Sequence, residues 1–142
     1  MIKPNIHPEG KVFFLTEAFP PVLAGSSVLN KNLLSYFHPD SFTVFTGKTN
    51  FKSKLEVPTD MDIRYVSRSF ENISGKLHQF SLKFQFQISK LRVSRALVKE
   101  NPVAIVATFP NYFYLRLGYE IAVKFKIPFY PYLNPLPKGE RK

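Results

Sequence analysis

The 142-residue sequence contains no cysteine and no tryptophan. Without cysteine, a disulfide scaffold, a zinc–thiolate site and thiol catalysis are excluded. No apolar run approaches the ~18 consecutive residues of a membrane-spanning helix. Residues 1–10 are too polar and too rich in proline for the apolar core of a secretory signal. These absences fit a cytoplasmic address.

Acidic side chains are also scarce, since ten Asp and Glu stand against twenty Lys and Arg and leave a net charge of +10. Such a surface favours anionic partners, which are nucleic acid, phosphorylated ligands or an acidic lipid surface. Nucleic acid is the least expected of these, because the sequence shows no RNP motif, KH-type GXXG loop or helix-turn-helix pattern. With 44% apolar residues, the chain has the composition of one folded domain.

Runs of β-forming residues alternate with segments of helical periodicity along the chain. The patterns predict strands at 11–16, 41–46, 62–66, 103–107 and 127–133, and helices at 28–37, 73–100 and 112–126. Strands that alternate with helices pair in parallel through right-handed crossovers. The expected fold class is therefore α/β, a Rossmann-like, doubly wound and mostly parallel sheet over residues 11–133. Residues 1–10 form an N-terminal tail, and 134–142 a C-terminal tail or the start of an interdomain connection.

The loop that follows the first strand is the first candidate site, because ligands of such sheets bind at the carboxyl ends of the strands. There Gly25, Ser26 and Ser27 open a helix, and free backbone N–H groups with the helix dipole favour a phosphate. A structural interpretation competes, in which Gly25 makes the turn and Ser26 caps the helix. Glu17 in the same loop is the carboxylate best placed near a ligand, or else an ordinary exposed acid.

The predicted helix at 73–100 is the second candidate. Residues 72–99 carry no acid but six cations, namely Lys76, Lys83, Lys90, Arg92, Arg95 and Lys99. Apolar side chains at helical spacing adjoin them, namely Leu77, Phe80, Phe84, Ile88 and Leu91. One interpretation is a basic amphipathic helix that lies on an anionic membrane. The other is a core helix with a solvated polar face, in which the phenylalanines pack inside the protein. The sequence leaves both interpretations open.

The sequence offers few groups of residues that could act together in catalysis. His7, His38 and His78 lie far apart in the chain, and the ten acids are scattered. The sequence shows neither the ligand spacing of a metal site nor a nucleophile elbow. No catalytic residue is therefore assigned, and no metal or other cofactor is expected.

Several segments, taken in order, resemble the start of family-4 glycosyltransferases. They are KVFFL at 11–15, FPP at 19–21, GSS at 25–27, FTVFTG at 42–47, NPVAIVATFP at 101–110, GYEIA at 118–122 and KIPF at 126–129. The sequence departs from the family pattern in two places. Ser26 stands where many members have a second adjacent glycine, and Tyr132 to Pro135 stand where many carry His or Arg followed by Asp.

The resemblance implies a GT-B enzyme with two Rossmann-like halves and an active site in the cleft between them. The N-terminal half takes the acceptor and the C-terminal half binds a nucleotide sugar, the co-substrate, without a metal. Gly25 and Ser26, with Ser27 and Glu17 in the same loop, would then approach the donor phosphates. The loops that would face the acceptor carry Thr108, Pro110, Asn111 and Asn134. Members also sit on membranes through basic, apolar N-domain surface, a role implied here for Lys76, Lys83, Lys90, Arg92 and Arg95.

The expected function is therefore that of the N-terminal, acceptor-side domain of a hexosyltransferase-type enzyme of polysaccharide biosynthesis. It would pass a sugar to a glycan or a lipid-linked acceptor, in the cytoplasm or at the inner face of the membrane. It would be inactive until paired with a C-terminal donor-binding half, in cis or in trans. The alternative is a stand-alone basic α/β binding module for an anionic membrane surface or for nucleic acid.

Overall fold

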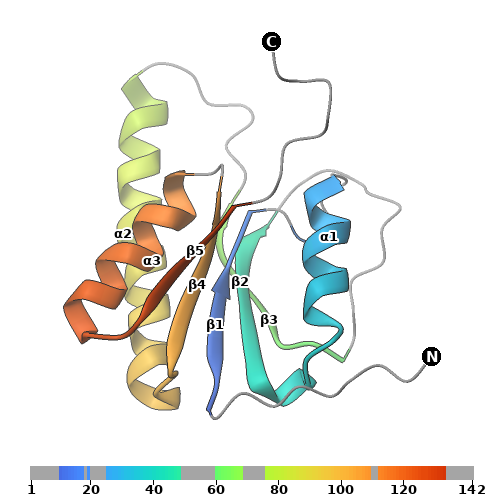
Figure 1. Ribbon diagram of the computed structural model, residues 1–142. Helices are drawn as coiled ribbons and strands as arrows, with labels where there is room; N and C mark the ends of the chain where they lie inside the picture. Colours follow the sequence, from blue (N-terminus) through green and yellow to red (C-terminus); the bar gives the residue numbers. More distant parts are fainter. Residues whose placement is uncertain are drawn as a thin grey trace.

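The computed structural model describes residues 10–17, 19, 25–48, 60–68, 76–109 and 112–133. Five strands form one sheet in the order β3-β2-β1-β4-β5, and every neighbouring pair is parallel (Figure 1). The strands are β1 (Val12–Leu15), β2 (Phe42–Lys48), β3 (Ile63–Arg68), β4 (Ala104–Phe109) and β5 (Phe129–Leu133). This arrangement confirms the predicted α/β, Rossmann-like fold.

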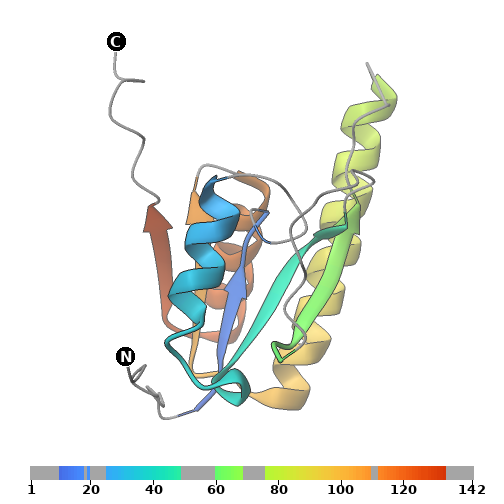
Figure 2. The same ribbon diagram turned by 90° about the vertical axis from the view of Figure 1, so that its right-hand side faces the viewer.

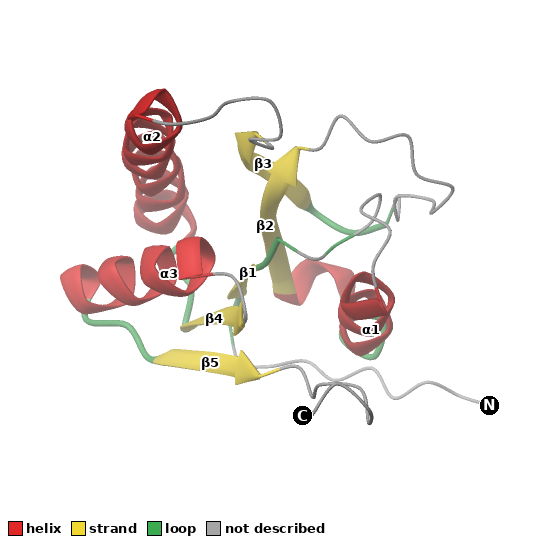
Figure 3. Cartoon of the chain, turned by 90° about the horizontal axis from the view of Figure 1, so that it is seen from above, coloured by secondary structure: helices red, strands yellow, loops and turns green. Residues whose placement is uncertain are grey.

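Helices cover both faces of the sheet. Helix α1 (Gly25–Leu34) lies on one face, whereas α2 (Lys76–Glu100) and α3 (Tyr112–Phe125) lie on the other (Figure 3). A short 3₁₀ helix (Pro39–Ser41) leads into β2. Because helices follow strands on both faces, the short strand β1 is apolar at every position: Phe13, Phe14 and Leu15 are all buried.

The core has two parts, one on each face of the sheet. Beneath α2 and α3 it contains Phe13, Leu15, Phe45, Val93, Leu97, Ile105, Leu117 and Ile121, among others. On the face of α1 it contains Phe14, Phe19, Leu34, Phe42 and Val44. Alternate residues of β1 therefore serve opposite halves of the core, as the period of a strand requires.

Several element boundaries differ from the predictions by one to three residues, and three of them bear on the site. Helix α1 ends at Leu34 rather than Phe37, because the N–H groups of Tyr36 and Phe37 turn back to the carbonyls of Leu33 and Leu34 and close a tighter turn. Strand β4 continues to Phe109 and therefore includes Thr108, which the sequence placed in the exit loop. Strand β2 likewise runs on to Lys48.

Pro131 lies inside β5 despite its missing N–H group. The position is compatible with a proline because β5 is at the end of the strand order and pairs with β4 alone. Residues 1–9 of the predicted N-terminal tail, the predicted C-terminal tail at 134–142 and residues 73–75 of the predicted long helix lie outside the described residues.

Candidate functional site at the carboxyl edge of the sheet

The strand order sets the position of the candidate site. The chain leaves β1 through α1 toward β2, and leaves β4 through α3 toward β5, on opposite sides of the adjacent β1 and β4. The two connections diverge at the carboxyl ends of these strands, and such a divergence is where doubly wound folds bind ligands. The N-terminus of α1 lies at this same edge (Figure 1).

Three buried polar side chains join the strands to α1 at this edge. The amide Nδ2 of Asn30 on α1 donates a hydrogen bond to Thr16 Oγ1, which directly follows β1, at 3.2 Å. The hydroxyl of Thr108 in β4 donates to the same oxygen at 2.7 Å. All three side chains are buried. We call them the hydroxyl cluster; it fixes α1 against the point where β1 and β4 end.

Two further buried hydroxyls lie on α1 and on β2. Ser27 is in the first turn of α1 and Thr46 is in β2, and both are almost fully buried. Neither hydroxyl oxygen has a hydrogen-bond partner within the described part of the chain. Buried polar atoms are normally satisfied, so these positions have hydrogen-bonding capacity that the described residues leave unused.

The buried side of α1 is more polar than the sequence pattern predicts. Ser27, Asn30 and Leu34 face the sheet, whereas Val28 and Leu29 are 40% and 51% exposed. The helix begins at Gly25, so Ser26 and Ser27 both lie inside its first turn, and the predicted cap at Ser26 is wrong. The spacing of Asn30, three residues after Ser27 and four before Leu34, puts these residues on one helical face and was the sequence signal that would have located this cluster.

The predicted site residues are distributed as follows. Glu17 is exposed and follows Thr16 at the end of β1, and its backbone carbonyl accepts from the Phe19 N–H at 3.2 Å. Gly25 and Ser26 open α1 at the same edge. Thr108 is buried in the hydroxyl cluster. Pro110, Asn111 and Asn134 lie outside the described residues.

Of the five cations predicted to face a membrane, four are exposed on α2: Lys76, Lys83, Arg92 and Arg95. Lys90 is half-buried instead and turns toward α3, where its ammonium lies 3.8 Å from a carboxylate oxygen of Glu120.

The structure has a groove between α2 and α3 that the sequence did not predict. It has a volume of about 420 Å³ and is lined by Leu82, Lys83, Phe86, Gln87, Tyr112, Phe113 and Arg116. The guanidinium of Arg116 lies over the ring of Phe86 at 4.7 Å and pairs with Glu120 at 3.0 Å. Because Tyr112 and Phe113 begin α3, the groove reaches the carboxyl edge of the sheet.

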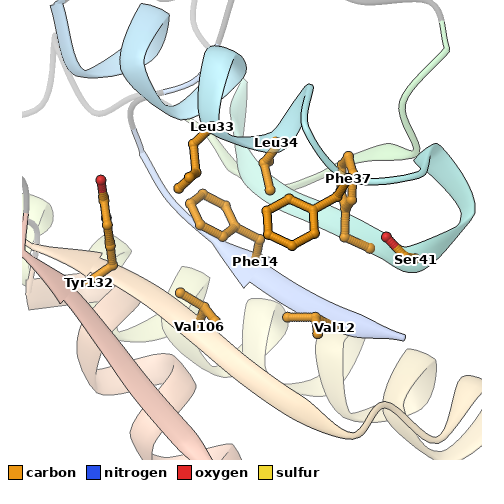
Figure 4. A pocket seen from close by; sticks show the side chains of 9 residues that line it. Val12, Phe14, Leu33, Leu34, Phe37, Ser41, Val106 and Tyr132 are labelled. Atoms are coloured by element: carbon orange, nitrogen blue, oxygen red, sulfur yellow. The ribbon is translucent and has the colours of Figure 1, made fainter. Parts of the chain in front are cut away.

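On the opposite face, α1 and the strands enclose an apolar groove of about 210 Å³, lined by Val12, Phe14, Leu33, Leu34, Phe37, Ser41, Phe42, Val106 and Tyr132. Figure 4 shows Leu33 and Leu34 above Phe14, with Val106 and Tyr132 contributed by the neighbouring strands. Ser41 and the tyrosine hydroxyl are its polar groups. Its chemistry suits an apolar group and not a phosphate.

Shifted pKa values lie elsewhere. Among the described residues they belong to Asp62, Arg64 and Glu100, a single ion network near the start of β3 and the end of α2. Within the described ranges, this network lies at the edge of the sheet opposite the carboxyl edge. In those ranges no three His, Asp or Glu side chains gather as metal ligands, and no helix is both long and apolar enough to cross a bilayer.

No family model and no curated protein matches the chain. Among solved structures, the UDP-GlcNAc 2-epimerase of Methanocaldococcus jannaschii is similar at 15% identity and a TM-score of 0.51, over 93% of this chain and 33% of the epimerase. The C-terminal domain of a Pyrococcus furiosus hydrogenase is similar at 11% identity and a TM-score of 0.55, over 89% of this chain and 94% of that domain. These likenesses establish the fold. The chain spans about a third of the epimerase's length.

Removing the central hydroxyl of the cluster is expected to loosen α1. Thr16→Val keeps the side-chain shape but leaves the Asn30 amide and the Thr108 hydroxyl without their acceptor, which should cost about 1–2 kcal/mol of the free energy of unfolding. Urea unfolding measures this. Thr108→Val should cost less in the Thr16→Val background than in the wild type. Strictly additive losses would show that the cluster does not act as a unit.

Proposed function

We propose that this chain is the acceptor-side domain of a glycosyltransferase of GT-B architecture. The complete enzyme would transfer a sugar from a nucleotide-sugar donor to a glycan or a lipid-linked acceptor. Its second wall would be a donor-binding Rossmann-like domain, supplied by the same polypeptide or by a partner. A GT-B cleft needs both walls, so the described domain alone should bind ligands without turnover.

The observation that carries this proposal is the carboxyl edge at β1 and β4. A Gly-Ser helix start, a buried hydroxyl cluster and the strand divergence meet there, in a fold shared with an epimerase that is named for a nucleotide sugar, UDP-GlcNAc. This chain covers about a third of that epimerase. The order of sequence motifs at 11–15, 25–27, 42–47 and 101–110 is the second support.

Within this proposal, backbone N–H groups at Gly25 and Ser26 receive the donor phosphates, because a helix N-terminus concentrates positive potential and glycine permits close approach. Glu17 and Ser27 belong to the same proposed donor site. The residues after β4, Pro110 and Asn111, and Asn134 after β5 contact the acceptor. Thr108 then acts as a positioning residue, because its hydroxyl holds the end of β4 against Thr16. No metal takes part.

The proposal is tested first by sequencing the gene beyond codon 142 and the adjacent frames. An in-frame or neighbouring Rossmann-like half with an E-x7-E pattern is the expected result. The joined or paired protein should then release nucleotide from a panel of UDP- and GDP-sugars when glycan or lipid-linked acceptors are added, with EDTA present. A paired protein that binds neither nucleotide sugar nor glycan would contradict the proposal.

In the active enzyme formed by the two joined or paired domains, Gly25→Val should lower kcat/KM by roughly 100-fold. The added side chain would displace the donor phosphate, and a displacement of about 1 Å is sufficient for such a loss. Asn32→Ala is the matched control, since Asn32 is exposed on the same helix, and its kcat/KM should stay within about twofold of the wild type. Equal effects of the two substitutions on kcat/KM would show that Gly25 has no particular role in donor binding.

A further inference from the structure

The outward side of α2 exposes large apolar side chains. Leu77, Phe80, Phe84, Leu91 and Val98 are 74%, 71%, 60%, 51% and 72% exposed. We call these five residues the apolar stripe. The opposite side of the helix, with Phe86, Val93 and Leu97, provides the contacts with the core. The interpretation of α2 as a helix whose phenylalanines all pack inside the protein is therefore wrong for Phe80 and Phe84.

Cations border the stripe on both sides. At 100° per residue, Lys76 and Lys83 lie along one border, and Arg92, Arg95 and Lys99 lie along or near the other. All five are exposed. Residues 76–99 contain no acidic side chain, and Lys90, which pairs with Glu120 on α3, lies outside this surface. The exposed side of α2 is thus apolar along its centre and positive at its borders.

The stripe is long and accessible. From Leu77 to Val98 it extends about 32 Å at ~1.5 Å per residue. The N-terminal half of α2 stands beyond the carboxyl edge of the sheet (Figure 2). Its two exposed phenylalanines lie on this projecting half, and Lys83 also lines the groove between α2 and α3.

We propose that α2 docks on an anionic lipid bilayer, with the apolar stripe in the interface and the bordering cations at the lipid headgroups. An apolar strip flanked by Lys and Arg is the pattern of interfacial helices, and negative lipid attracts the cations. A second copy of this chain fits poorly, because pairing two such stripes would bring like charges together. This inference rests on α2 and not on the proposed enzymatic function.

Docking by α2 has a consequence for the candidate site. The projecting half of the helix is next to the carboxyl edge of the sheet, so a bilayer in contact with Phe80 and Phe84 brings that edge close to the lipid surface. A membrane-embedded ligand would then reach the groove between α2 and α3 without leaving the interface.

Vesicle flotation tests the proposal with the full 142-residue chain. Binding is expected to vesicles of phosphatidylcholine with about 30% phosphatidylglycerol, to be much weaker on phosphatidylcholine alone, and to fall as salt rises from about 0.1 M to about 0.5 M. Equal binding to both vesicle types, or binding to neither, overturns the proposal.

Two double variants separate the contribution of the cations to vesicle binding from that of the apolar side chains. Lys76→Glu with Lys83→Glu should weaken binding to the anionic vesicles by about 25-fold or more, at roughly fivefold per lysine. Acids near a helix N-terminus are favourable, so this pair should fold. Phe80→Gln with Phe84→Gln should weaken binding about tenfold or more, through the loss of apolar surface in contact with lipid. The matched control is Val123→Gln with Lys124→Glu, an exposed apolar–cation pair on α3, and it should bind as the wild type does.

The absence of tryptophan allows a direct measurement of insertion. Phe80→Trp introduces a single tryptophan on the stripe, and Val123→Trp introduces one on α3 as control. When the anionic vesicles are added, only the emission of the first tryptophan should shift to shorter wavelength and be quenched by brominated lipid. A blue shift in both, or in neither, counts against insertion of the stripe.

Three other outcomes would overturn the proposal. Vesicle binding that depends on Lys76 and Lys83 but not on the phenylalanines would be non-specific adsorption of a cationic protein. A lipid-free dimer that Phe80→Gln with Phe84→Gln converts to a monomer would make the stripe a contact between copies. Salt-sensitive binding to random RNA without vesicle binding would assign the cations to nucleic acid.

Discussion

Gly118→Leu is expected to destabilise the domain by about 3 kcal/mol, the upper part of the range for overpacking a core. Gly118 is buried in the middle of α3. A Cβ atom there would lie 2.9 Å from Phe129 Cε2, 3.2 Å from Ala107 Cβ and 3.4 Å from Ile105 Cγ2. The glycine therefore lets α3 approach β4 and β5 closely, and a leucine would push the helix away from both strands.

Thermal and urea unfolding measure this loss, and two other substitutions calibrate it. Gly118→Ala should have a small net effect, because the helix propensity gained from alanine, about 1 kcal/mol, offsets the close contacts of one methyl group. Val123→Leu, at an exposed position of the same helix, should change stability by less than about 0.5 kcal/mol. If Gly118→Leu were as stable as Val123→Leu, the close helix–sheet contact would be refuted.

Glu100→Ala is expected to lower the free energy of unfolding by about 2 kcal/mol, or roughly 6 °C in Tm. Glu100 ends α2 and accepts hydrogen bonds from Lys11 Nζ at 2.8 Å and from Arg64 Nη1 and Nη2 at 2.6 and 2.8 Å. Its side chain is 17% exposed. Arg64 and Asp62, which is 2.8 Å from the same guanidinium, are each more than a third exposed, so solvent screening keeps the cost below that of a fully buried pair.

The same network makes stability depend on pH. The Arg64 guanidinium, followed by Lys11, holds the pKa of Glu100 at about 2 instead of 4.5, against the opposing effect of burial. The pKa of Asp62 is also lowered: burial acts to raise it, but hydrogen bonds from Arg64 and Thr43 outweigh that effect. A carboxyl with a lowered folded-state pKa contributes its full stability above the unfolded-state pKa and loses it as the pH falls toward the folded value.

Wild-type stability should therefore fall between about pH 4.5 and about pH 2 as these carboxyls take up protons. In Glu100→Gln most of this acid-side slope should be absent, with the remainder due to Asp62. Urea unfolding at several pH values measures both slopes. Parallel curves for the wild type and Glu100→Gln would show that Glu100 has an ordinary pKa in the folded protein.

The order and type of the elements followed from local patterns. The continuous apolar run at 11–16 predicted a strand covered on both faces, and β1 is such a strand. One long helix was predicted at 73–100, and α2 confirms it over the described part, Lys76–Glu100. These predictions succeed because propensity and period are properties of neighbouring residues, whatever the rest of the chain does.

The candidate site was only partly predictable. The Gly-Ser helix start lies at the carboxyl edge as predicted, because parallel strands bring their ends to one side of the sheet, whereas Thr108 belongs to β4 and not to its exit loop. The hydroxyl cluster was not predicted, since its bonds join residues 14 and 92 positions apart. The ion network was not predicted either, since Lys11 and Glu100 are 89 positions apart.

The sequence by itself determined that strands and helices alternate, that the strands run parallel, and that the long helix carries cations without acids. Only the tertiary structure decided the strand order, the contacts at the carboxyl edge and which side of α2 is covered. Both sides of that helix carry large apolar residues, so its periodicity is satisfied equally by burying either one. The packing of α2 against β3 and α3 selects Phe86, Val93 and Leu97 for the core and leaves Leu77, Phe80 and Phe84 exposed.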